Sequence, residues 1–174
     1  MSDQRSPVSM NDDEAAAFAE EVFDRARQGD AVMLGRLLDK GLPANLRNHK
    51  GDSLLMLAAY HGHVEAVQTL LEKGADPLIA NDNGQLPLAG SAFKGDLAMV
   101  QVLIEHGVPV DASAADGRTA LMMAAMFNRT AIVDYLLAKG ADPLHQDAKG
   151  MSALDAALAM GASDTAAQLQ ALRG

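Results

Sequence analysis

Histidines are the residues of this sequence best suited to metal binding or proton transfer, because an imidazole nitrogen serves both purposes near neutral pH. His61 and His63 form an H-x-H pair and His49 lies nearby, whereas His106 and His145 stand alone. A protein zinc site takes three or four ligands at fixed geometry and often uses thiolates, but the sequence contains no cysteine. We therefore predict structural or surface roles for the histidines and no metal site.

Carboxylates and hydroxyls give no stronger indication of catalysis. Asp155 interrupts an apolar stretch between Leu154 and Ala156, but no second acid or base accompanies it at a spacing suited to general acid–base chemistry. Ser91 and Ser152 lack the sharp turn of a nucleophile elbow, and no glycine-rich phosphate loop is present. We therefore predict no catalytic residue and no cofactor, and we expect Asp155 to be exposed or bonded to backbone.

The elements that position these residues repeat along the chain. Glycines recur at intervals of 33 residues, and further glycines and apolar pairs keep the same register. A fixed period of this length is typical of a repeat array, in which each unit packs only on its neighbours. The columns are Gly51, Gly84, Gly117 and Gly150; Gly41, Gly74, Gly107 and Gly140; and Leu37–Leu38, Leu70–Leu71, Leu103–Ile104 and Leu136–Leu137.

The repeated unit resembles the ankyrin repeat, whose pattern is G-x-T-P-L-H-x-A-A, then G-H-x-x-x-V-x-x-L-L, then G-A-D-P. The segment from Gly51 to Pro77 matches it best, and the resemblance covers roughly residues 15–174. It implies an all-α solenoid of stacked helix-turn-helix units with short hairpin loops. The expected organisation is a flexible acidic tail (1–12) and one ankyrin domain (13–174), made of an N-terminal capping unit (13–47), three full repeats (48–80, 81–113, 114–146) and a C-terminal capping repeat (147–174).

Local signals predict two helices in each unit. Ser53, Thr119 and Ser152 stand where a hydroxyl caps the first helix, and glycines such as Gly62 stand at the turn between the helices. Asn128 replaces that glycine in one unit, which is compatible because asparagine tolerates a left-handed backbone. The family's TPLH histidine is replaced by methionine, alanine or aspartate, so we expect the units to rely more on packing there.

Composition argues against several classes of function. The net charge is −9, and residues 1–30 hold eight acidic residues against three arginines. An acidic chain without a basic stripe argues against nucleic acid and against an anionic membrane surface. No apolar run is long enough to span a bilayer, and the N-terminal residues lack the apolar core of a secretory signal. We therefore expect a cytoplasmic location.

The resemblance also implies where a partner binds, on the concave surface formed by the hairpin tips and the ends of the first helices. The expected function is a non-catalytic protein-interaction module, such as an adaptor, regulator or inhibitor, that is a monomer or self-associates weakly. Carried over by register, the expected partner-binding residues are Lys50, Asp52, Asp82, Asn83, Gln85, Asp116, Arg118, Lys149 and Met151 at the tips, and Tyr60, His61, Phe93, Lys94, Met126, Phe127 and Met160 at the helix ends.

Aromatic residues concentrate on this expected surface. The chain has six aromatics, and we expect Tyr60, Phe93 and Phe127 to form one exposed ladder with Met160 across successive units. Exposed apolar groups of this kind mark partner sites and supply interface anchors. Two alternatives remain open. The rings lie between neighbouring repeats and only help them stack, or the concave groove holds a small molecule, a metal ion or a small-enzyme site.

Overall fold

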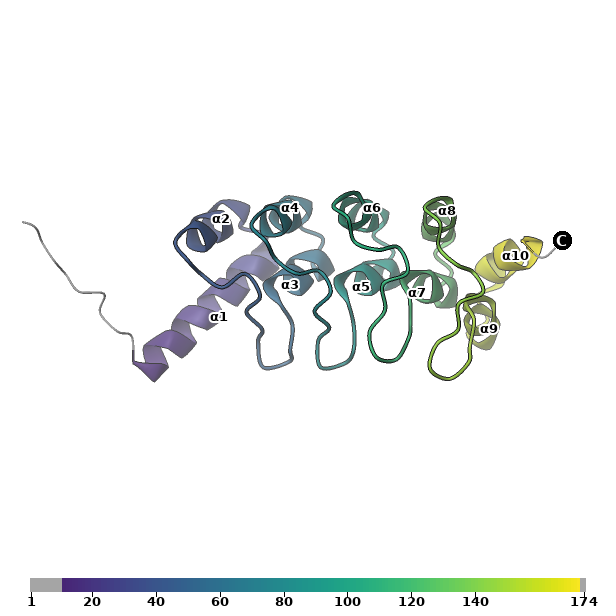
Figure 1. Ribbon diagram of the computed structural model, residues 1–174, viewed down its shortest axis with the longest axis horizontal. Coiled ribbons are helices and arrows are strands. Elements are labelled where there is room, and N and C mark those ends of the chain that lie inside the picture. Colours follow the sequence, from purple (N-terminus) through teal and green to yellow (C-terminus); the bar gives the residue numbers. More distant parts are fainter. Residues whose placement is uncertain (1–10, 173–174) are drawn as a thin grey trace, which may run out of the picture.

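The computed structural model describes residues 11–172, and these residues form ten helices and one isolated bridge between Arg47 and Ser53. Figure 1 shows the odd-numbered helices in one row and the even-numbered helices along a second row, with long loops projecting past the first row. The prediction of an all-α solenoid is confirmed. The helices are α1 (Asp12–Gln28), α2 (Ala31–Asp39), α3 (Leu54–Tyr60), α4 (Val64–Glu72), α5 (Pro87–Lys94), α6 (Leu97–Glu105), α7 (Ala120–Met126), α8 (Thr130–Ala138), α9 (Ala153–Ala159) and α10 (Ser163–Ala171).

One boundary differs from the sequence prediction. Asn11 and Asp12, which we expected in a flexible tail, belong to the first helix, because Asn11 caps α1 and Asp12 is its first residue. Asn11 Oδ1 accepts a hydrogen bond from the Glu14 backbone N–H while Glu14 bonds back to the Asn11 N–H, which is a capping box. The rest of the predicted tail, residues 1–10, and residues 173–174 lie outside the described residues. Within residues 11–172 no helix is both long and apolar enough to cross a membrane.

The first helix of each full unit begins largely as the sequence predicts. Side-chain oxygens of Ser53, Thr119 and Ser152 accept hydrogen bonds from backbone N–H groups in the first turns of α3, α7 and α9. Helix α5 differs, because Leu86 stands at the capping position and Pro87 is the first helical residue. Proline suits that position, since its missing N–H would have no partner in the helix.

The turn between the two helices of a unit requires a left-handed residue. Asn128 adopts a φ of 61° there, as predicted, where the other units have glycine. Its Oδ1 also accepts hydrogen bonds from the backbone N–H groups of Asp164 and Thr165, both at 3.1 Å. Asn128 therefore caps α10 of the following unit, whose own capping residue, Ala162, supplies no side-chain acceptor.

The core is one continuous strip shared by all units. The inner helices pack in order, α1 on α3, α3 on α5, α5 on α7 and α7 on α9, and the second row packs in the same way. Alanines such as Ala58, Ala92 and Ala125 are completely buried within this strip and leave room for neighbouring helices to approach closely. Large apolar side chains, including Leu70 and Leu136, complete the burial.

The long loops between units are hydrogen-bonded to one another in pairs. In the first pair, loop 40–53 contacts loop 73–86: Asn45 Oδ1 accepts from the Asp76 N–H at 2.8 Å, and the Lys50 carbonyl accepts from the Asp82 N–H at 3.1 Å. These bonds join both the bases and the tips of the two loops, so the pair is fixed at two points.

The second pair joins loop 106–119 to loop 139–152 at the same register positions. The Asp111 carboxylate accepts from the Asp142 N–H, with the shorter contact at 3.1 Å, and the Asp116 carbonyl accepts from the Ala148 N–H at 2.9 Å. Between the two pairs, loops 73–86 and 106–119 form no such bond among the residues described here. The sequence explains why the hydrogen bond between the bases of these two loops is missing.

The missing hydrogen bond between the bases of loops 73–86 and 106–119 results from two departures from the repeat pattern. Leu78 occupies the register position of Asn45 and Asp111 and has no side-chain acceptor. Pro109 occupies the position of Asp76 and Asp142 and has no backbone N–H to donate. Both partners of the expected bond are therefore missing at the same junction.

Candidate functional site

A continuous groove runs between the ends of the inner helices and the tips of the long loops. It consists of four cavities in line, with volumes of about 230, 310, 80 and 80 Å³ from the α1 end to the α9 end. The first and second cavities share Asp52 and Tyr60, the second and third share Asn83 and Gln85, and the third and fourth share Arg118. Because each cavity shares a wall with the next, we treat them as one groove.

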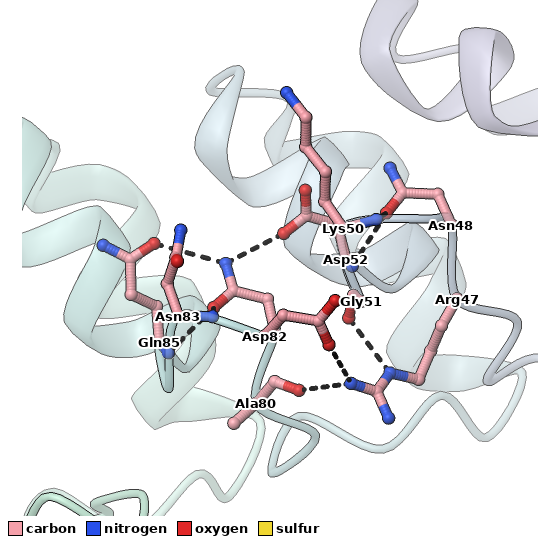
Figure 2. A network of polar contacts seen from close by, with 10 residues as sticks. Arg47, Asn48, Lys50, Gly51, Asp52, Ala80, Asp82, Asn83 and Gln85 are labelled. Atoms are coloured by element: carbon pink, nitrogen blue, oxygen red, sulfur yellow. Dashed lines mark hydrogen bonds and ion pairs between the residues drawn. The ribbon is translucent and has the colours of Figure 1, made fainter.

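Asparagine side chains shape the loop tips that form one wall of the groove. Asn48 Oδ1 accepts hydrogen bonds from the backbone N–H groups of Lys50 and Asp52, at 3.0 and 2.9 Å (Figure 2). Asn81 makes the same pair of bonds one repeat later, at 3.1 and 2.9 Å. Asp147 makes the pair in the last loop, at 2.9 and 3.0 Å. Such bonds stabilise a tight turn by replacing backbone partners.

Arg47 ties the first tip to the second. Its Nε donates to the Gly51 carbonyl at 3.0 Å, and its Nη2 donates to the Ala80 carbonyl at 3.1 Å (Figure 2). The same Nη2 lies 3.5 Å from Asp82 Oδ1, and both side chains of this ion pair are largely exposed. The guanidinium therefore fixes the spacing of the two tips mainly through the two carbonyl oxygens.

The third tip lacks the turn-forming side chain. Ala114 occupies the register position of Asn48, Asn81 and Asp147 and has no acceptor to offer. The tip keeps the backbone bond from the Gly117 N–H to the Ala114 carbonyl, at 3.0 Å, and Asp116 Oδ1 accepts from the Arg118 N–H at 3.1 Å. This tip is consequently held by fewer hydrogen bonds than its three counterparts among the described residues.

Positive charge gathers around Tyr60 at the α1 end of the groove. The Tyr60 ring is 39% exposed, the Lys94 Nζ lies 4.2 Å from its centre, and the His61 ring packs against it edge-on at 5.6 Å. Burial lowers the pKa of His61, and the positive charges of His63, Lys94 and Arg27 lower it further. The neutral form of His61 is therefore favoured in the folded protein.

The predicted aromatic ladder is not a single row. The Phe93 and Phe127 rings meet edge to face, with centres 4.7 Å apart, and both are half-buried against the core. This contact joins neighbouring repeats, as the packing alternative expects, whereas Tyr60 is exposed. The register explains the difference. Tyr60, Phe93 and Met126 share one position, and His61, Lys94, Phe127 and Met160 share the next.

Methionines line the α9 end of the groove. Met122, Met126, Met151 and Met160 surround the last cavity together with two alanines, and Met160 is 52% exposed. Two charged residues, Arg118 and Asp147, also line it. Methionine is flexible and polarisable, so such a wall adapts to apolar groups of different shapes.

Most residues predicted for the partner surface line the groove. Asp82, Lys94, Phe127 and Lys149 do not: Asp82 pairs with Arg47, Lys94 covers Tyr60, Phe127 packs on Phe93, and Lys149 is exposed at the last tip. Those that line it are Lys50, Asp52, Tyr60, His61, Asn83, Gln85, Phe93, Asp116, Arg118, Met126, Met151 and Met160.

Sequence reasoning missed several residues of the groove. Met56 and Met122 are buried, yet their side chains also line its floor. Arg27 reaches the first cavity from α1, outside the units with a clear repeat pattern. Asn81 was absent from the predicted set, although the recurrence of Asn48 and Asp147 at its register position could have indicated a structural role.

The residues first considered for chemistry have structural roles. His63 Nε2 donates to the Arg27 carbonyl at 2.7 Å, and Asp155 accepts from the Ser152 backbone N–H at 3.0 Å, as expected for a carboxylate bonded to backbone. Ser91 is buried and its hydroxyl donates to the carbonyl one turn earlier in α5. Within residues 11–172 no group of three or more potential ligands gathers as a metal site would require.

Comparison with known families agrees with this arrangement. The family model of ankyrin repeats, which comprises three copies of the repeat, matches residues 23–114 and 90–172. The chain belongs to the ankyrin repeat family. Ankyrin repeats are general protein–protein interaction modules, and the family is typically non-catalytic.

Two relatives illustrate the range of proteins that carry similar repeats. A Pseudomonas aeruginosa protein named as an ankyrin repeat protein is 57% identical over 63 residues, which is 36% of this chain and 37% of that protein. A protein of Oryza sativa subsp. japonica, named as a probable E3 ubiquitin-protein ligase, is 46% identical over 44 residues, or 25% of this chain and 9% of that protein. Both matches span well under two thirds of the relative's length.

Proposed function

We propose that this ankyrin repeat protein is a non-catalytic binding module that holds one protein partner in the groove and serves as an adaptor, regulator or inhibitor. The observation that carries the proposal is the continuity of the groove across successive units, from Arg27 to Met160. A surface of this length suits a polypeptide better than a small molecule, whose sites are single concave pockets. The proposal places the protein in the cytoplasm and treats it as a monomer that binds neither nucleic acid nor membrane.

Two exposed groups in the groove supply anchors for a partner. Tyr60 and Met160 are 39% and 52% exposed, so a partner can cover them without unfolding any part of the array. Truncating an interface anchor of this kind typically weakens a complex by about 1–2 kcal/mol or more. Phe93 and Phe127 are poor choices for a test, because their contact joins neighbouring repeats.

Affinity purification from the native cell extract tests the proposal. The bait proteins are the wild-type chain, a groove variant (Tyr60→Ser with Met160→Ser) and a matched control (Val32→Ser with Leu78→Ser). The control removes two side chains that are 62% and 49% exposed and lie outside the groove. We expect a protein that the wild type and the control retain and the groove variant loses.

Other outcomes separate the alternatives. A partner that all three baits retain equally would place its site outside the groove and overturn the proposal. A metabolite or metal ion that raises the melting temperature of the wild type but not of the groove variant would favour the ligand-binding alternative, because a ligand of the native state stabilises it by mass action. Circular dichroism of each variant serves as the folding control.

A further inference from the structure

We infer that the groove binds an extended acidic segment of its partner, with a carboxylate side chain at the α1 end and a large apolar side chain at the α9 end. The inference rests on the proposed function, since it specifies the chemistry of a partner in the same groove. It follows from the different character of the two end cavities and from the polar wall between them.

The α1 end of the groove is positively charged. Lys50 lines the first cavity and Lys94 lies over the Tyr60 ring beside it, and neither forms an ion pair within residues 11–172. Figure 2 shows the Lys50 side chain extending away from the network of the loop tips. The first cavity is lined by Arg27, Asn48, His49, Lys50, Asp52, Leu57, Tyr60 and His61.

The acidic groups at this end offset only part of the positive charge. The Asp24 carboxylate pairs with Arg27 at 2.6 Å, and the Asp52 carboxylate, which accepts from the neutral Asn81 amide at 2.9 Å, keeps its charge. Against these two carboxylates, Arg27, Lys50 and Lys94 leave an excess of one positive charge. The remaining positive excess contrasts with the net charge of −9 of the whole chain. Complementary charge speeds the association of two surfaces and fixes their register, so this end favours a negatively charged group of the partner.

The pKa of His61 depends on the positive charges at this end of the groove. Its pKa is lowered first by burial and then by neighbouring positive charges, and a partner carboxylate placed there would oppose the second effect. A partner carboxylate should therefore raise the pKa of His61. An apolar side chain at the same place should lower it, because further desolvation lowers the pKa of a histidine.

The α9 end selects an apolar side chain. Its cavity of about 80 Å³ is walled by methionines and alanines, with Met126 and Met160 on the inner-helix side and Met151 on the loop side. Burying a leucine, methionine or phenylalanine there removes apolar surface of both molecules from water, at about 25 cal/mol per Å². Arg118 and Asp147 also line this cavity, and Asp147 Oδ1 already accepts from the backbone N–H groups of Lys149 and Met151.

The wall between the end cavities suits a main chain. Asn83 and Gln85 present side-chain amides to the second and third cavities, and an amide both donates to and accepts from a peptide group. The two end cavities are three inner-helix spacings apart, or about 24–30 Å at 8–10 Å per packed helix pair. An extended chain rises about 3.3 Å per residue, so the carboxylate and the apolar side chain are roughly 7–9 residues apart.

Selection from a display library tests the inference. The probe is a library of random peptides of about 12 residues, which exceeds the span calculated from the strand rise. It is selected on the wild-type chain and on the groove variant Tyr60→Ser with Met160→Ser. We expect enriched peptides to carry Asp or Glu near one end and Leu, Met or Phe roughly 7–9 residues away, and to bind the groove variant poorly.

Charge-reversal variants then measure the acidic contact directly. For an enriched peptide, Lys50→Glu with Lys94→Glu is expected to weaken binding by on the order of tenfold or more, while the matched control Lys40→Glu with Lys139→Glu, which adds the same charge outside the groove, changes it little. Replacing the peptide's acid by its amide should cause a similar loss on the wild type and little further loss on the Lys50 and Lys94 variant.

The outcomes distinguish the inference from the proposed function. Peptides that depend on Tyr60 and Met160 but lack an acid, or that tolerate Lys50→Glu with Lys94→Glu, would overturn the inference and leave the proposed function standing. No groove-dependent enrichment would overturn the extended-segment inference, and the purification experiment would still decide the proposed function. Selection of phosphate-containing ligands over carboxylates in a follow-up competition would also contradict it.

Discussion

At the scale of single residues, His61 is a probe of the charge in the groove. Its pKa is lowered by burial and by His63, Lys94 and Arg27, so Lys94→Gln should move the pKa of His61 back up towards its ordinary value. Proton NMR of the imidazole as a function of pH measures this directly. An unchanged or lower pKa in the variant would contradict the assigned cause.

The same pKa fixes the sign of a pH effect on stability. The unfolded chain binds a proton at His61 more readily than the folded chain does, because its pKa is the higher of the two. The free energy of unfolding should therefore have a contribution from His61 that is fully present above pH of about 6.5 and declines as the pH falls below it. The effect is small, since His61 is only slightly buried and remains largely exposed to solvent.

Asn128 carries two roles that substitutions can separate. Asn128→Gly keeps the left-handed turn but removes the cap of α10, for an expected loss of about 1 kcal/mol in the free energy of unfolding. Asn128→Ala removes the cap and also places a Cβ in the left-handed region, adding roughly 1–2 kcal/mol. Urea unfolding followed by circular dichroism gives both values, and equal stability of the two variants would show that backbone strain is unimportant there.

At the scale of elements, the third loop tip is the least supported. Ala114→Asn should add an acceptor for the Asp116 N–H and offer the Arg118 N–H an alternative to Asp116 Oδ1, raising the free energy of unfolding by about 0.5–1.5 kcal/mol. Ala115→Asn, which changes the exposed neighbour, is the matched control and should be nearly neutral. Thermal and urea denaturation of the pair compare them. A neutral Ala114→Asn would mean that tip 114–118 cannot adopt the turn of its counterparts.

Much of this element structure could be predicted from the chain alone. The 33-residue recurrence of Gly51 and its counterparts predicts the units, and Ser53 predicts a helix start, because each depends on local backbone preference. The edge-to-face contact of Phe93 with Phe127 could not be predicted, since it depends on how far adjacent units rotate against each other. The groove floor at Met56 escaped prediction because a buried side chain can also border a cavity.

At the scale of the whole molecule, the missing bond between loops 73–86 and 106–119 can be restored. Leu78→Asn with Pro109→Asp recreates the acceptor and donor found at the Asn45–Asp76 contact. The coupling between the two substitutions should favour the folded state by about 1 kcal/mol. Each single variant gains nothing from that bond, and Pro109→Asp alone should destabilise by about 0.4–1 kcal/mol through the freer unfolded chain.

A double-mutant cycle in urea supplies the measurement. The four proteins are the wild type, the two single variants and the double variant, and the coupling is the deviation from additivity. Additive effects within about 0.3–0.5 kcal/mol would contradict the expected bond. Pro109→Asp introduces a backbone N–H at position 109. Hydrogen exchange of this N–H should be slower in the double variant than in the Pro109→Asp single variant. That comparison gives an independent readout.

The pairing of the loops defines two blocks that meet at a seam between loops 73–86 and 106–119. The helices still join the blocks there through the Phe93–Phe127 contact and the bonds from the Arg129 guanidinium to the Phe93 carbonyl. Bending across that seam stretches no loop-to-loop bond among the described residues, whereas bending within either block breaks several. We therefore expect changes in the curvature of the solenoid to meet less resistance from the loops at this seam than within either block. A ligand that contacts both ends of the groove should accordingly restrict the angle between the two blocks. A ligand that contacts only one end should leave that angle unrestricted.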